Sequence, residues 1–312
     1  MPSEPFLPTR LIEITTEGAE VKARLHETLH DVGSPVYMTL SHCWESGAVW
    51  KLLRATYRAA LESLPMRDLP PVFMDAISVA SSAGINFLWI DSVCIVQDDV
   101  DDWSKESART GDIYGGAICN VAATGFTDGS HGLFAARNTQ TLGPIAVKLD
   151  FPIIFNEYDG IIETEFYLVD RDVWVRGVDR APLNKRSWVV QERYLSPRII
   201  HFGRQQLFWE CCELTASETF PHGLPSRLLI RSAPSVLLNA IYSGKKAIDE
   251  ASLSEDDFID WWTIVSAYSL GRLTFATDKL VAISGMARSF QSFSRSRYLA
   301  GLWERNLPHD LL

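Results

Sequence analysis

Three stretches of almost continuous apolar residues punctuate the first 125 positions of the chain. They cover residues 36–40, 87–90 and 119–123, and each runs directly into a short polar segment. Apolar runs of this length without strict alternation are typical of parallel strands that are covered on both faces. The pattern therefore predicts three buried strands, each ending at a group of polar side chains.

Two helices are predicted between these strands. The first begins at Pro70 and Pro71 and ends before Gly84, a glycine suited to close a helix. Its apolar residues recur at helical spacing and are Val72, Ala76, Val79, Ala80 and Ala83. The second helix is expected from about residue 99 to 115, where four aspartates within 98–102 complement the positive end of the helix dipole. The alternation of strands and helices predicts an α/β fold with an open, mostly parallel sheet flanked by helices.

The pattern changes in the middle of the chain. Residues 143–175 are rich in Ile, Phe, Tyr and Val with Gly and Pro breaks, which predicts short antiparallel strands or long loops. A helix over residues 186–195 and a hairpin with strands at 198–202 and 206–210 are expected to follow. From residue 235 onward the pattern is mostly helical, with Trp261, Val265, Tyr268 and Leu270 on one face and a second helical segment at 278–290.

These patterns suggest two parts of one domain. Residues 1–140 form the predicted α/β core. Residues 141–312 form its continuation, with a β-rich insertion and a C-terminal helical part.

The composition is that of a globular protein. Hydrophobic residues make up 46% of the 312 positions, and the net charge of −10 disfavours nucleic acid as a partner. No apolar run approaches the roughly 18 residues that span a membrane, and the N-terminus lacks the features of a secretory signal. Five scattered cysteines without a Cys-x-x-Cys pair indicate reduced thiols and no zinc site. We expect a cytoplasmic protein that binds no metal, membrane or nucleic acid.

Four sequence blocks form a specific combination. They are YMTLSHCW at residues 37–44, GINFLWIDSVCIVQD at 84–98, RSWVVQER at 186–193 and YLAGLW at 298–303. Together with shorter matches they cover nearly the whole chain and resemble the fungal heterokaryon incompatibility (HET) domain family. Two positions depart from the family pattern: Glu45 replaces a common Gly, which alters the expected turn, and Thr110 replaces a common Met.

The resemblance implies self/non-self recognition between fungal cells and programmed cell death. It also implies a distant relation to TIR domains, some of which hydrolyse NAD, so NAD enters as a candidate substrate rather than a cofactor. The family often carries further modules; because the resemblance extends to the end of the chain, we expect no attached sensor or oligomerisation module.

Whether the protein is an enzyme is left open by the sequence, which is compatible with three functions. The first is a HET protein with NAD-glycohydrolase-like activity. The second is a non-catalytic module that acts by self-association or through a protein partner. The third is a small-molecule enzyme of fungal secondary metabolism that uses the same cleft. A small-molecule or nucleotide ligand is expected in the first and third cases.

The ends of the predicted strands define the candidate site, because ligands of open α/β sheets bind beyond the carboxyl ends of the strands. If the strands are parallel neighbours, seven residues meet there: Ser41, His42, Cys43, Asp91, Ser92, Cys94 and Thr124. Cys43 as nucleophile with His42 as base and Asp91 as orienting acid is one interpretation. Neighbouring strand residues point to opposite faces, however, so His42 is poorly placed to activate Cys43. Buried structural roles are the alternative.

Glu106 is the most informative single residue. On a helical projection it falls within the apolar stripe of Trp103, Thr110 and Tyr114. A carboxylate in a buried stripe must be paired, hydrogen-bonded or raised in pKa, and Arg109 is a candidate partner one turn later. The structural interpretation is a buried ion pair that orders the helix against the sheet.

In the catalytic interpretation, Glu106 stabilises an oxocarbenium-like transition state at a nucleotide glycosidic bond. Trp44 or Trp103 would then stack on a base or on nicotinamide. The helix over residues 186–195 supplies Arg186, Gln191 and Glu192 as further ligand-binding candidates; a solvated or ion-paired helix face is the alternative.

Overall fold

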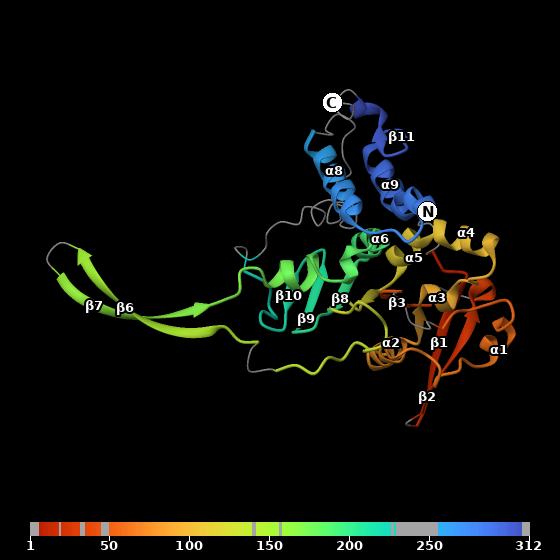
Figure 1. Cartoon of the computed structure of the whole chain (residues 1–312), viewed down its shortest axis with the longest axis horizontal. Helices are drawn as coiled ribbons and strands as arrows, with labels where there is room; N and C mark the ends of the chain where they lie inside the picture. Colours follow the sequence, from red (N-terminus) through yellow and green to blue (C-terminus); the bar gives the residue numbers. More distant parts are fainter. Residues whose placement is uncertain are drawn as a thin grey trace.

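An eight-stranded sheet with the strand order β10-β9-β8-β5-β3-β4-β1-β2 forms the centre of the molecule (Figure 1). The computed structural model describes residues 6–18, 20–31, 35–44, 50–138, 142–155, 158–225, 228 and 255–307. Helices cover both faces of the sheet, which confirms the expected open α/β class. The sheet takes strands from both sides of residue 140, and the division at that residue stays a prediction.

The four central strands are parallel. They are β3 (Met38–Ser41), β4 (Phe87–Trp89), β5 (Cys119–Ala122) and β8 (Arg198–Phe202). β3 pairs with β4 on one side and β5 on the other, and β8 pairs with β5. The three strands predicted from apolar runs are therefore parallel neighbours, and their carboxyl ends meet at one edge of the sheet.

Antiparallel strands extend the sheet at both edges, so the sheet as a whole is mixed. β1 (Arg10–Glu17) and β2 (Glu20–Glu27) form a hairpin beside β4. On the other side, β9 (Leu207–Cys211) pairs with β8 and continues to β10 (Thr215–Ser217). The β8–β9 hairpin agrees with the sequence prediction, whereas the β1–β2 hairpin was not predicted.

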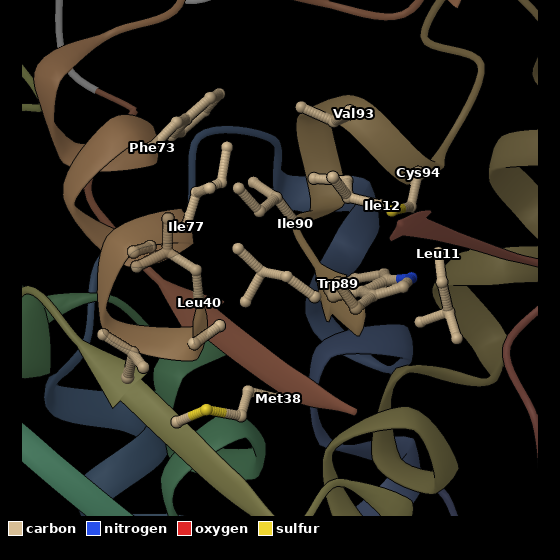
Figure 2. Packing of buried hydrophobic residues seen from close by; sticks show 14 of the residues in the cluster. Leu11, Ile12, Met38, Leu40, Phe73, Ile77, Trp89, Ile90, Val93 and Cys94 are labelled. Carbon is tan, nitrogen blue, oxygen red and sulfur yellow. The ribbon is translucent and has the colours of Figure 1, made fainter. Parts of the chain in front are cut away.

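The helix α2 (Pro71–Ser82) covers one face of the sheet. Its residues Phe73 and Ile77 are fully buried in the same core cluster as the sheet residues Leu40 and Leu88 (Figure 2). Gly84 follows the helix with a φ angle of +73°, a left-handed conformation in which glycine carries no steric penalty. The predicted start and end of this helix are both confirmed.

The other face carries two helices where the sequence predicted one over residues 99–115. α4 (Val100–Ala108) and α5 (Thr110–Gly116) are separated by a break at Arg109. The predicted buried stripe is nonetheless present, because Glu106, Thr110 and Tyr114 are all buried. α5 packs on the later helices so closely that a Cβ atom on Gly111 would lie 2.8 Å from the Cα of Gly285. We infer that the break at Arg109 lets α5 follow this contact.

The C-terminal helical part packs on α6 (Trp188–Leu195). It consists of α8 (Glu255–Leu270), α9 (Val281–Ser294) and the small strands β11 (Tyr298–Leu299) and β12 (Leu302–Trp303). Trp261 is fully buried against Phe290 and Trp303, but Leu270 is 86% exposed. The expectation that Leu270 lies on the buried face was wrong, since it is the last residue of α8, where the chain turns away.

A long hairpin projects from the body of the molecule (Figure 1). It is formed by β6 (Ile145–Phe155) and β7 (Tyr158–Leu168), so the predicted β-rich segment is one extended antiparallel pair. Two short helices, α1 (Tyr57–Glu62) and α3 (Asp91–Cys94), complete the fold around the sheet. In the described part of the chain, no helix is both long enough and apolar enough to cross a membrane. The predicted helical residues 235–254 lie outside the described residues.

Candidate active site

Asp91 is the centre of the polar group at the strand ends. It follows β4 and begins α3, and its Oδ2 accepts a hydrogen bond of 2.8 Å from the Trp44 indole nitrogen. Its Oδ1 accepts one of 2.7 Å from the Ser92 backbone nitrogen and lies 3.9 Å from Nδ1 of His42. The ends of β3 and β4 therefore meet at this carboxylate, as the strand order requires.

The helix α6 and the segment before it bring two further charges to Asp91. Glu192 is buried, and the Ser41 and Tyr114 hydroxyls act on its carboxylate and favour its charged form. Arg186 donates a hydrogen bond to the His42 backbone carbonyl. The cluster of Ser41, His42, Trp44, Asp91, Tyr114, Arg186 and Glu192 is called the strand-end cluster below.

The two acids of the strand-end cluster have raised pKa values. Burial raises the pKa of Asp91 to about 7, helped by the negative charge of Glu192, although Arg186 opposes the shift. Burial also raises the pKa of Glu192, against the effects of Arg186 and the two hydroxyls. Two interacting acids of this kind titrate as a pair. We expect the pair to retain a proton close to neutral pH.

The imidazole of His42 is neutral. Its side chain is buried, with Phe73 edge-on at 5.0 Å and Trp44 stacked at 6.1 Å between ring centroids. Burial and the charge of Arg186 lower the pKa of His42 to about 3. Its Nε2 atom has no hydrogen-bond partner among the described residues. Such a group can orient a polar atom of a ligand, but it is a weak base at neutral pH.

A family model described as heterokaryon incompatibility protein (HET) matches residues 37–192, half of the chain. The chain belongs to the HET family. No curated protein and no solved structure matches the sequence. The HET match begins just before β3 and ends at Glu192, so it contains every residue of the strand-end cluster.

The two candidate cysteines of the HET region lie apart from this cluster. Cys43 is buried in a separate apolar cluster with Leu183, Val189 and Ile199, consistent with opposite orientations of neighbouring strand residues. Cys94 lies in the core beside Ile12 (Figure 2), and burial raises its pKa to about 12. A thiol in such surroundings is a poor nucleophile. Roles for Cys43 in catalysis and for Cys94 in ligand binding stay predictions.

Thr124 belongs to a second buried network. Its hydroxyl lies 2.9 Å from Nδ1 of His201, and Nε2 of His201 lies 3.3 Å from the Glu210 carboxylate. Arg193 donates to both oxygens of Glu210, at 2.8 and 3.1 Å, and to Asp179 at 3.0 Å. Thr124 and His201 are fully buried, which is typical of groups that order the fold. Sequence reasoning missed this network because β9, which carries Glu210, has no catalytic motif.

Glu106 contacts the N-terminal segment of the chain. Its Oε1 accepts a hydrogen bond of 2.5 Å from the Thr9 hydroxyl and lies 3.8 Å from the Arg109 guanidinium, so the predicted partner is present. Its side chain is only 1% exposed, in agreement with the buried stripe predicted from the helical projection. Arg109 also contacts the Phe6 ring, with 4.6 Å to the ring centroid. A catalytic role for Glu106 stays a prediction.

The remaining candidates have structural surroundings. Gln191 accepts a hydrogen bond of 3.3 Å from the Gly285 nitrogen in α9, and Trp103 packs against the main core. The Ser92 hydroxyl is buried without a partner among the described residues. Sequence reasoning missed Asn120, which donates to Ser41 at 3.0 Å from the middle of β5. In the described part of the chain, no group of three or more His, Cys, Asp or Glu side chains is arranged to hold a metal ion.

Proposed function

We propose that this HET protein acts in self/non-self recognition and cell-death signalling, and that the strand-end cluster is the catalytic centre of an NAD-glycohydrolase-like reaction. One observation carries the catalytic part. Asp91 and Glu192, two acids with raised pKa values, lie with Arg186 near the carboxyl ends of the parallel strands, where ligands of this fold class bind, and the charge of Glu192 acts on Asp91. The Asp91 side chain is 31% exposed, so solvent reaches this carboxylate even though burial raises its pKa.

The chemistry needs few groups. The bond between ribose C1′ and the nicotinamide nitrogen breaks, and its electron pair stays on that nitrogen. Water adds to C1′ and gives its proton to the ionised member of the Asp91–Glu192 pair. The same carboxylate stabilises the positive charge that develops on the ribose. In this proposal Arg186 would pair with a phosphate group, and the half-buried Trp44 ring would exchange its contact with Lys51 for stacking on nicotinamide.

A non-catalytic interaction module is the second candidate function. It is supported by Glu106, which is enclosed between Thr9 and Arg109 as expected for an ordering ion pair. It is also supported by the exposed apolar side chains at the base of the β6–β7 hairpin, among them Ile145, Tyr167 and Leu168.

Replacing Glu192 by glutamine tests the catalytic proposal. We expect the full-length protein to release nicotinamide from NAD and the Glu192→Gln variant to do so about 100-fold more slowly or worse, because loss of a general base typically costs 10²–10⁴ in rate. Nicotinamide release is measured by chromatography. Glu304→Gln, which changes an exposed acid outside the cluster, is the matched control and is expected to retain wild-type activity.

Two outcomes of this assay contradict the catalytic proposal. One is the absence of nicotinamide release from folded wild-type protein at high protein concentration, which would favour the interaction module. The other is turnover that survives Glu192→Gln but is lost in Glu106→Gln, which would move the reaction centre to the helix α4.

A further inference from the structure

A cleft of about 340 Å³ lies between β1, α1 and the start of α4, and none of the strand-end cluster lines it. Three arginines and two aspartates dominate its walls, and the lining residues are Arg10, Arg54, Tyr57, Arg58, Val96, Asp99 and Asp102. Its volume lies at the lower end of the range of small-molecule sites in proteins.

Two of the arginines are held in place by the two aspartates. Arg10 is buried and donates from Nη2 to both oxygens of Asp102, at 2.6 Å each, and from Nε to the Cys94 carbonyl at 2.7 Å. Arg54 lies 2.9 Å from the Asp99 carboxylate. The two acids of the cleft are therefore neutralised within its walls.

The third arginine, Arg58, is exposed and forms no ion pair with the residues that the structure describes. The cleft thus presents three guanidinium groups against two carboxylates. The lining itself carries one more guanidinium than carboxylates on a protein whose net charge is −10, and Asp98 and Glu27 lie beside it, hydrogen-bonded to the Arg54 backbone nitrogen and the Tyr57 hydroxyl. Tyr57 and Val96 provide apolar surface beside these charges, and the Arg10 guanidinium lies 5.9 Å from the centre of the Tyr57 ring.

We propose that this cleft binds a small phosphorylated molecule. The guanidinium fork matches the geometry of phosphate oxygens, and pairing with Asp99 and Asp102 fixes two of the forks before a ligand arrives. Arg58 forms no ion pair with the described residues, so its positive charge is available to the ligand. The apolar side of Tyr57 accommodates the carbon skeleton of the ligand. This site is independent of the proposed NAD chemistry.

Titration calorimetry of the full-length protein with inorganic phosphate tests the proposal, with chloride held constant. We expect saturable binding with a millimolar Kd, and a Kd at least about tenfold higher for Arg58→Gln, the loss expected for one charge-assisted contact. Arg58 is exposed, so its replacement is not expected to disturb the fold. Arg171→Gln, at an exposed arginine outside the cleft, is the matched control and is expected to stay within about twofold of the wild-type Kd.

Three results would overturn this proposal. The first is the absence of saturable phosphate binding by the folded protein. The second is a Kd that Arg58→Gln leaves unchanged or that Arg171→Gln raises equally, which would indicate non-specific attraction. The third is equally tight binding of acetate, which would assign the cleft to carboxylates instead of phosphate groups.

Discussion

Replacing Arg193 by alanine is expected to lower the free energy of unfolding by about 3–5 kcal/mol. Arg193 is 6% exposed and forms three hydrogen bonds to Glu210 and Asp179. Its charge and the contact with His201 hold the pKa of Glu210 at about 2, although burial opposes this. Without Arg193, the buried Glu210 carboxylate loses its cationic partner. His201 then stays beside it and compensates only if its imidazole takes up a proton.

Urea denaturation followed by circular dichroism measures this loss. Arg193→Met keeps most of the aliphatic volume and is expected to lose nearly as much stability as Arg193→Ala, which separates the charge effect from packing. Arg180→Ala, at an exposed arginine nearby, is expected to change stability by less than about 0.5 kcal/mol. A loss below about 1 kcal/mol for Arg193→Ala would show that the network contributes little to stability.

Replacing Asp91 by asparagine is expected to stabilise the protein at pH 8 by about 2 kcal/mol. The pKa of Asp91 is raised from 3.8 to about 7 by burial and by Glu192. The folded state therefore binds a proton between about pH 4 and pH 7 that the unfolded state has released, so this group lowers stability as the pH rises through that window. Asparagine carries no charge and can still accept the Trp44 hydrogen bond.

Measuring melting temperatures over a range of pH values provides the control for the Asp91→Asn prediction. The difference in melting temperature between Asp91→Asn and wild type should be near zero at pH 4 and reach its maximum above pH 7. Asp172→Asn, at an exposed aspartate, should show no such trend. A destabilised Asp91→Asn variant at pH 8 would mean that the ionised carboxylate is favourable in the fold. If Asp91 is a catalytic acid, Asp91→Asn should gain stability and lose activity, because the ionised carboxylate lowers the stability of the fold.

The sequence predicted the part of the site that follows from local pattern and topology. The apolar runs before Ser41, Asp91 and Thr124 identified three parallel strands, and the rule for strand ends placed His42 and Asp91 together. Family resemblance was confirmed over residues 37–192. The helical projection correctly placed Glu106 in a buried stripe.

The sequence could not predict which distant residues complete each group. Thr9 meets Glu106 across 97 positions, and β1 joins the sheet through pairing of Ile12 with Leu88. Neither contact leaves a local signal. Nearly all residues of α6 are buried, because α6 packs between α5 and α9. Its sequence therefore does not separate a polar, exposed face from an apolar, buried one. For this reason the sequence did not distinguish Glu192 in the site from an ion-paired surface residue.

Titration of the Asp91 carboxylate by carbon-13 NMR, assigned with Asp91→Asn, tests the central claim most directly. We expect a pKa of about 7 for Asp91 in the wild-type protein and a lower value in Glu192→Gln, because removing the neighbouring negative charge favours ionisation. An Asp91 pKa close to that of an ordinary aspartate, or one that Glu192→Gln leaves unchanged, would contradict the interacting acid pair on which the proposed chemistry depends.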